Sequence, residues 1–121
     1  MTDQDPSRKI TDIDMAKLAK AIEHFRILDK EIPAQVIACF LYVASHDDCN
    51  KIDMEKALKF SSASGSRNTD WLGAYHRLNK PGLGLIIKYR DPNNRRKQIL
   101  QLSPKGLKLA KELKEILYPE D

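Results

Sequence analysis

The chain has 121 residues, of which 41% are hydrophobic and 31% are charged. This composition is typical of a globular domain and excludes a disordered chain, and no apolar run approaches the roughly 20 residues that cross a bilayer. The length suits one domain. Lys and Arg outnumber Asp and Glu by 21 to 17, giving a net charge of +4, which permits binding to nucleic acid without showing it.

Residues 1–10 are polar and lack an apolar segment, so we expect a flexible tail rather than a secretory signal, and a cytoplasmic protein. Residues 11–121 then form the single domain. Apolar residues recur at steps of three and four along 12–28, which predicts a helix capped by Thr11 or Asp12. The stripe consists of Met15, Leu18, Ile22, Phe25 and Leu28. Such a stripe suits either a core or a dimer interface.

The next stretch predicts two further helices. Pro33 suits the first turn of a helix over 34–44, whose apolar residues lie nearly all round, as in a helix buried in the middle of a domain. Residues 50–52 are expected to form a short extended link, after which Asp53 caps a third helix with apolar residues up to Phe60.

The serine-rich residues 61–66 favour turns and caps, so we expect a turn there. A fourth helix follows. Its inward side carries residues at i, i+3, i+4 and i+7, namely Trp71, Ala74, Tyr75 and Leu78. Gly73 is unusual in the middle of a helix, and either close approach to a DNA backbone or tight packing against another helix would explain it.

The last third of the chain predicts a β-hairpin and a final helix. We expect a strand over 85–90 with Leu85, Ile87 and Tyr89 on one face, a turn over 91–94, and a second strand over 97–102. Ser103 before Pro104 is typical of an N-cap followed by the first helical position, and the helix continues to about 118. The expected order is α-α-α-α-β-β-α.

Two helices joined by a turn and followed by a hairpin with a basic tip are the layout of a winged helix-turn-helix, mainly α with a small β-hairpin. In this fold the second helix enters the major groove and the hairpin, or wing, reaches the minor groove. We therefore predict sequence-specific binding of double-stranded DNA by a transcriptional regulator that represses by occlusion.

The predicted DNA-binding residues fall on three elements. The recognition helix supplies Ser66, Arg67, Asn68, Thr69, Asp70, Gly73, His76 and Arg77. The wing supplies Lys88, Arg90, Asn93, Asn94, Arg95, Arg96 and Lys97. Lys105 is predicted to contact phosphate. Arg67 has the geometry to bind guanine and Asn68 to pair with adenine, while a solvated basic turn is the plainer interpretation of the wing tip.

The segments Gly84 to Ile86, Asp91 to Arg96 and Ile99 to Gly106 resemble the wing and the following helix start of the multiple-antibiotic-resistance regulator (MarR) family. The resemblance implies a recognition helix at about Arg67 to Asn79 and a wing arginine at Arg95 or Arg96. It also implies a homodimer formed by the terminal helices, about 12–28 and 104–118, and regulation by a small-molecule effector that no residue identifies. The expected dimer interface comprises Met15, Leu18, Ile22, Phe25, Leu113, Ile116 and Leu117.

We expect neither an enzyme nor a cofactor, because the three histidines lie in separate elements and no phosphate loop or nucleophile motif accompanies them. The histidines are His24, His46 and His76. Residues 46–49 contain groups that ligate metals, but their spacing matches no structural zinc pattern and favours an ordinary loop. Thiol sensing by Cys39 or Cys49 stays open, since it requires exposure and a lowered pKa.

The main alternative function is a winged-helix module that binds another protein of a transcription or regulatory complex, because fold alone does not fix function. Such a module has no need of a basic wing tip. Salt dependence separates the two functions, since contacts to phosphate weaken steeply as salt is raised.

Overall fold

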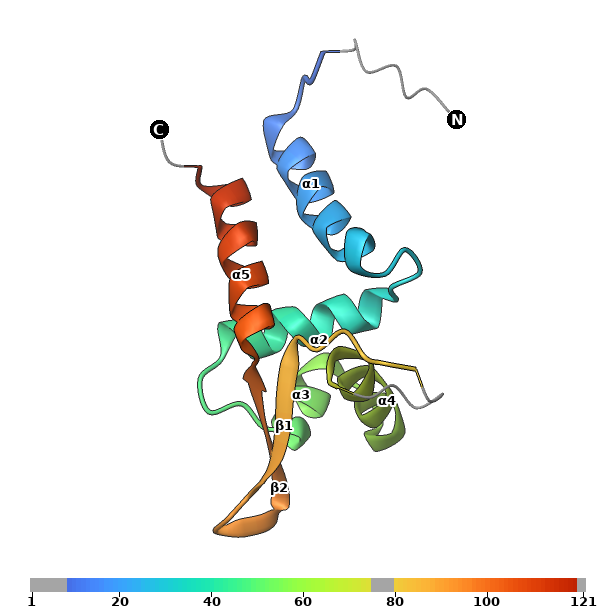
Figure 1. Ribbon diagram of the computed structural model, residues 1–121, viewed down its shortest axis with the longest axis vertical. Helices are drawn as coiled ribbons and strands as arrows, with labels where there is room; N and C mark the ends of the chain where they lie inside the picture. Colours follow the sequence, from blue (N-terminus) through green and yellow to red (C-terminus); the bar gives the residue numbers. More distant parts are fainter. Residues whose placement is uncertain (1–8, 75–79, 120–121) are drawn as a thin grey trace.

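The computed structural model describes residues 9–74 and 80–119. Within these ranges the chain forms a mainly α fold with a small antiparallel hairpin, in the predicted order (Figure 1). The elements are α1 (Ile13–Leu28), α2 (Ala34–Ser45), α3 (Lys51–Leu58), α4 (Ser62–Leu72), β1 (Ile86–Asp91), β2 (Asn94–Leu102) and α5 (Pro104–Leu117). No helix in the described part of the chain is long and apolar enough to cross a membrane.

The elements divide between two ends of the molecule (Figure 1). Helices α1 and α5 lie side by side at one end, and α2 crosses below them. Helices α3 and α4 and the hairpin lie at the other end, and the tip of the hairpin points away from α1 and α5. The fold therefore separates the terminal helices from the helix-turn-helix and wing.

The core lies around α2, where the two ends meet. Phe25 of α1 packs edge-on against Phe40 of α2, with ring centroids 5.5 Å apart. The other fully buried large side chains come from α2, α3, α4, β2 and the segment before β1, namely Val36, Cys39, Met54, Thr69, Leu72, Leu85 and Leu100. One core thus joins α1 to the helix-turn-helix, as expected for a single domain.

Two predicted helix caps are confirmed. The side chain of Asp12 accepts a hydrogen bond from Met15 N at 3.1 Å and begins α1. Ser103 caps α5 by accepting from Gly106 N at 3.0 Å, with Pro104 as the first helical residue. Pro33 stands one position earlier than expected, at the N-cap of α2.

The predicted start of α3 is wrong. Residues 50–52 are not an extended link, because Asn50 is the N-cap and α3 begins at Lys51. The side chain of Asn50 accepts from Asp53 N at 2.9 Å, so Asp53 is the third residue of the helix and not its cap. The helix ends at Leu58, and Lys59 follows in the left-handed conformation (φ 58°), which places Phe60 beyond α3.

The predicted turn over residues 61–66 is also wrong, because Ser61 caps α4 and the helix begins at Ser62. Ser61 Oγ accepts from Ser64 N at 3.1 Å, so the serine-rich composition marks a helix start. Gly73 is the C-cap, not a mid-helix residue, and its N–H bonds the carbonyls of Thr69 and Asp70. The expected continuation over 75–79 lies outside the described residues.

The hairpin is longer than predicted and turns its other face inward. Strand β2 begins at Asn94 rather than at residue 97. Ile87 and Tyr89 lie on one face of β1 and are 46% and 42% exposed, so that apolar face points outward. The register pairs Lys88 with Leu100, and paired residues point to the same side of an antiparallel sheet. Since Leu100 is buried in the core, Lys88 lies on the inward face of the hairpin.

Gly65 allows α4 to pack closely on α3. A Cβ atom there would overlap Glu55 Oε2 and lie 2.6 Å from Glu55 Cγ. Moving the Glu55 side chain away would break its ion pair with Lys51, and both side chains of this pair are largely buried. We therefore expect Gly65→Ala to lower the free energy of unfolding by about 1–3 kcal/mol in urea denaturation, despite the better helix propensity of alanine. Ser62→Ala, at an exposed position of the same helix, should change it by less than about 0.5 kcal/mol. Equal stability of the two variants would contradict the close packing.

Candidate nucleic-acid interface

One face of α4 packs on the core through Gly65, Asn68, Thr69 and Leu72, and Trp71 is partly buried against it. The other side chains of the helix are exposed or half-buried and are Ser62, Ala63, Ser64, Ser66, Arg67 and Asp70. Arg67 Nη2 donates to Ser64 Oγ at 3.0 Å, which holds the guanidinium along the first turns of the helix. The helix thus presents a small, polar outer surface with one cation.

Two predicted recognition residues point inward. Asn68 is 6% exposed, and its Nδ2 donates to Gln35 Oε1 of α2 at 3.1 Å, so pairing of Asn68 with adenine does not fit its position. Thr69 is fully buried, and its Oγ1 donates to the Gly65 carbonyl at 2.8 Å. Gly73 ends the helix. The predicted residues His76 and Arg77 lie outside the described residues.

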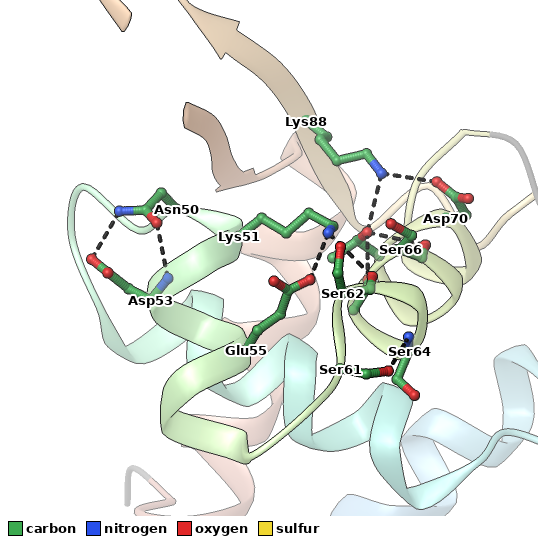
Figure 2. A network of polar contacts seen from close by, with 12 residues as sticks. Asn50, Lys51, Asp53, Glu55, Ser61, Ser62, Ser64, Ser66, Asp70 and Lys88 are labelled. Carbon is green, nitrogen blue, oxygen red and sulfur yellow. Dashed lines mark hydrogen bonds and ion pairs between the residues drawn. The ribbon is translucent and has the colours of Figure 1, made fainter. Parts of the chain in front are cut away.

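A polar network holds α4 in place from two sides (Figure 2). Lys51 Nζ lies 2.5 Å from Glu55 Oε2 and donates to the Ser62 carbonyl at 3.3 Å. Both side chains of this pair are only about a tenth exposed, at 10% and 11%. Both members of the pair belong to α3, and the hydrogen bond from Lys51 to the Ser62 carbonyl holds the first turn of α4 against them.

The second contact comes from the wing. Lys88 Nζ lies 2.9 Å from Asp70 Oδ1 and donates to Thr69 Oγ1 at 3.1 Å (Figure 2). Lys88 was predicted to meet DNA together with the other wing cations. The structure instead directs its ammonium group at α4.

The turn of the wing is held by local hydrogen bonds. Asp91 Oδ1 accepts from Asn93 N at 2.8 Å, and Asn94 Oδ1 accepts from Arg96 N at 3.2 Å. Arg90 Nη1 donates to the Arg95 carbonyl at 2.8 Å across the hairpin. The side chains beyond these bonds are exposed and basic, namely Arg95, Arg96 and Lys97. The wing therefore carries its charge at a tip whose backbone is well supported.

Lys105 lies farther from the tip, in the first turn of α5. Its side chain is exposed, and Nζ donates to the Leu83 carbonyl at 2.8 Å. This bond ties α5 to the segment that leads into β1. Contact of Lys105 with phosphate stays a prediction.

The residues predicted for a dimer interface separate into two groups. Phe25 and Leu113 are 2% and 8% exposed and belong to the core of the chain. Ile116 is partly buried against that core. The remaining four residues are 40–55% exposed along α1 and at the end of α5, namely Met15, Leu18, Ile22 and Leu117. Among the seven residues predicted for the interface, only these four offer much apolar surface to a partner.

Both cysteines are buried thiols without a disulfide. Burial raises the pKa of Cys39 to about 12 and that of Cys49 to about 11, with smaller contributions from neighbouring negative charges. A raised pKa keeps a thiol protonated and unreactive, which argues against thiol sensing. The described residues contain no group of three His, Cys, Asp or Glu side chains that could hold a metal.

No protein-family model and no curated protein matches the sequence. Solved structures do share the fold. The DNA complex of MepR from S. aureus has a TM-score of 0.64 and 22% identity over 86% of this chain and 75% of MepR. A MarR mutant from E. coli complexed with operator DNA has a TM-score of 0.62 and 16% identity, over 88% of this chain and 69% of that one. The transcriptional repressor CouR, bound to a 23-mer duplex, has a TM-score of 0.58 and 20% identity, over 98% and 80%.

The chain thus has the winged helix-turn-helix fold of MarR-type regulators, as the wing motif predicted. In this fold α4 occupies the place of the recognition helix and β1 and β2 form the wing. The three neighbours are DNA-bound regulatory proteins, and none is an enzyme.

The buried thiols predict alkaline destabilisation. Because both pKa values are raised from 9.0 in the folded chain, the unfolded chain loses the two protons at lower pH. Their contribution to stability is complete below about pH 9 and is lost as the pH rises to about 11–12, with a slope of at most about 1.4 kcal/mol per pH unit for each thiol. We expect the urea midpoint to fall between about pH 8 and 10.5, and to fall less in Cys39→Ala/Cys49→Ala. An equally steep fall in that variant would contradict the assignment.

Proposed function

We propose that this protein binds double-stranded DNA in a sequence-dependent manner and regulates transcription, by default as a repressor that occludes its operator. One observation carries the proposal. Helix α4 and the tip of the wing lie at the same end of the molecule, away from α1 and α5, so both can meet one duplex (Figure 1). The DNA complexes among the structural neighbours support the same arrangement.

Each element has a role in this proposal. Helix α4 enters the major groove, where Ser66 and Arg67 lie on its exposed face and the fork of Arg67 suits guanine. Arg95 or Arg96 at the wing tip enters the adjacent minor groove, whose negative potential favours arginine. Lys97 and the exposed Arg90 lie beside them to meet phosphates, which fix position without reading sequence.

The proposal includes a homodimer with two-fold symmetry. The exposed apolar residues of α1 and the end of α5 lie at the end opposite the wing, so pairing there leaves two recognition helices free. Two-fold pairing predicts half-sites about one helical turn, roughly 10 base pairs, between centres.

A small-molecule effector of this binding stays a prediction. We place it in a cavity of about 520 Å³ between α2 and α5, because its walls are mainly apolar side chains such as Phe40, Leu41 and Leu107. Lys111 and Lys114 also line it and suit an acidic group on the ligand. We place the protein in the cytoplasm, where the two cysteines remain reduced thiols.

Arginine variants test the proposed interface. Arg67→Ala should relax base preference at one position of the site by about 1–3 kcal/mol, as measured by fluorescence anisotropy on a panel of single-base variants of a duplex selected from a random pool. The double variant Arg95→Ala/Arg96→Ala should weaken binding to all duplexes alike. Lys20→Ala/Lys108→Ala removes the same charge from exposed positions of α1 and α5 and should bind nearly as the unchanged protein does.

Salt dependence decides between DNA and a protein as partner. Six to ten phosphate contacts cost about 10³–10⁵ in affinity between 50 and 200 mM salt. We expect a steep decline for the selected duplex and a shallower one for Arg95→Ala/Arg96→Ala. Failure to select any duplex, together with a protein complex that is indifferent to salt, would favour the protein-binding module.

The dimer interface has its own test. We expect Leu18→Glu/Ile22→Glu to convert the protein to a monomer in sedimentation equilibrium, because carboxylates would enter an apolar contact. Ile27→Glu is the control, since Ile27 is 77% exposed and lies about half a turn around α1 from Leu18. Loss of the dimer in the control as well, or its persistence in the double variant, would place the interface elsewhere.

A further inference from the structure

Lys88 differs from the other wing cations in where its side chain points. It lies opposite Leu100 on the inward face of the hairpin, whereas Arg95, Arg96 and Lys97 are exposed at the tip. Its ammonium group contacts two consecutive residues of α4, at 2.9 Å from Asp70 Oδ1 and 3.1 Å from Thr69 Oγ1. No wing cation in the described part of the chain other than Lys88 forms an ion pair with α4.

The contact continues through α4 to α3. Thr69, which accepts from Lys88, donates in turn to the carbonyl of Gly65 at 2.8 Å. Gly65 is the position at which α4 packs on Glu55, the partner of Lys51. Polar contacts therefore link the wing to α4 through Lys88, and a separate hydrogen bond from Lys51 to the Ser62 carbonyl links α4 to α3 (Figure 2).

Asp70 places a negative charge on the face of α4 that is proposed to meet DNA. It belongs to the exposed face of α4, where a carboxylate would repel the phosphates of a duplex. Lys88 places a positive charge 2.9 Å from it, which cancels much of that repulsion and leaves neither group free to act as an independent charge.

From these contacts we propose that Lys88 is a positioning residue that fixes the wing relative to the recognition helix and neutralises Asp70, rather than a phosphate contact. The inference rests on the proposed function, since the geometry that Lys88 fixes is the one that lets α4 and the wing engage neighbouring grooves. It assigns Lys88 and Asp70 to one unit, and so predicts that their substitutions are not additive.

The sign of the Asp70 effect separates the two roles. If Lys88 binds phosphate, Asp70→Asn removes a repulsive charge and frees the lysine, so DNA affinity rises. If Lys88 positions the wing, Asp70→Asn lowers affinity by about two- to fivefold, the range expected for a partly exposed pair. Lys88→Met should lower affinity to a similar extent, because it leaves the Asp70 carboxylate without its partner. Lys88→Met/Asp70→Asn, which removes both charges, should leave the slope of affinity against salt unchanged, whereas loss of a phosphate contact reduces that slope by about one.

The decisive variant exchanges the charges, Lys88→Asp/Asp70→Lys. We expect it to restore at least half of the affinity lost in the single variants, with base preference on the single-base panel unchanged. Lys97→Met is the matched control, because it removes an exposed wing cation and should reduce the salt slope. Higher affinity in Asp70→Asn, or additive losses in Lys88→Met/Asp70→Asn, would overturn the proposal.

A measurement without DNA separates this inference from the proposed function. In Lys88→Met, hydrogen exchange of the amides in β1 and β2 should accelerate severalfold, while exchange in α1 and α5 stays as in the unchanged protein. Unchanged exchange in the hairpin would overturn the positioning role even if the protein binds DNA. Faster exchange in a protein that selects no duplex would leave the link between wing and helix intact and refute the DNA-binding function instead.

Discussion

The close contact between α3 and α4 at Gly65 is the constraint on which the rest of this structure depends. The absence of a side chain there lets Glu55 lie against α4, and its buried partner Lys51 also donates to the Ser62 carbonyl of α4. This contact sets the rotation of α4 about its own axis. The rotation, in turn, decides which polar side chains the recognition helix presents and which it buries.

Polar side chains of α4 and the wing therefore fall into two groups, those held inside the structure and those left on its surface. Asn68 and Thr69 have side chains that can hydrogen-bond to bases. In the structure, however, Asn68 donates to Gln35 of α2, and Thr69 donates to the Gly65 carbonyl of α4 itself. Lys88 has the charge of a phosphate contact, but it pairs with Asp70. The residues left outward, Arg67 and the wing-tip cations, are fewer and lie at the outer margin of the motif. Much of the polar composition of this region therefore holds the interface in shape rather than forming its surface.

At the other end of the molecule, α1 carries both buried and exposed apolar residues. On α1 the apolar stripe serves two purposes, because Phe25 packs on Phe40 inside the core while Leu18 and Ile22 stay exposed. A single helical repeat cannot show this division, since spacing reveals a shared face and not what covers it. The core around α2 connects the exposed stripe to the helix-turn-helix, and so joins the surface proposed for dimerisation to the surface proposed for DNA.

The sequence by itself determined the order of elements, the caps at Asp12 and Ser103, the turn of the wing and its basic tip, because these depend on residues within about four positions of one another. It misplaced the start of α4, because serine favours caps and turns alike and only packing at Gly65 selects the helix. Only the tertiary structure decided that Asn68 and Lys88 face inward. Burial and ion pairing join residues from separate elements, and no local pattern contains the register and rotation that bring them together.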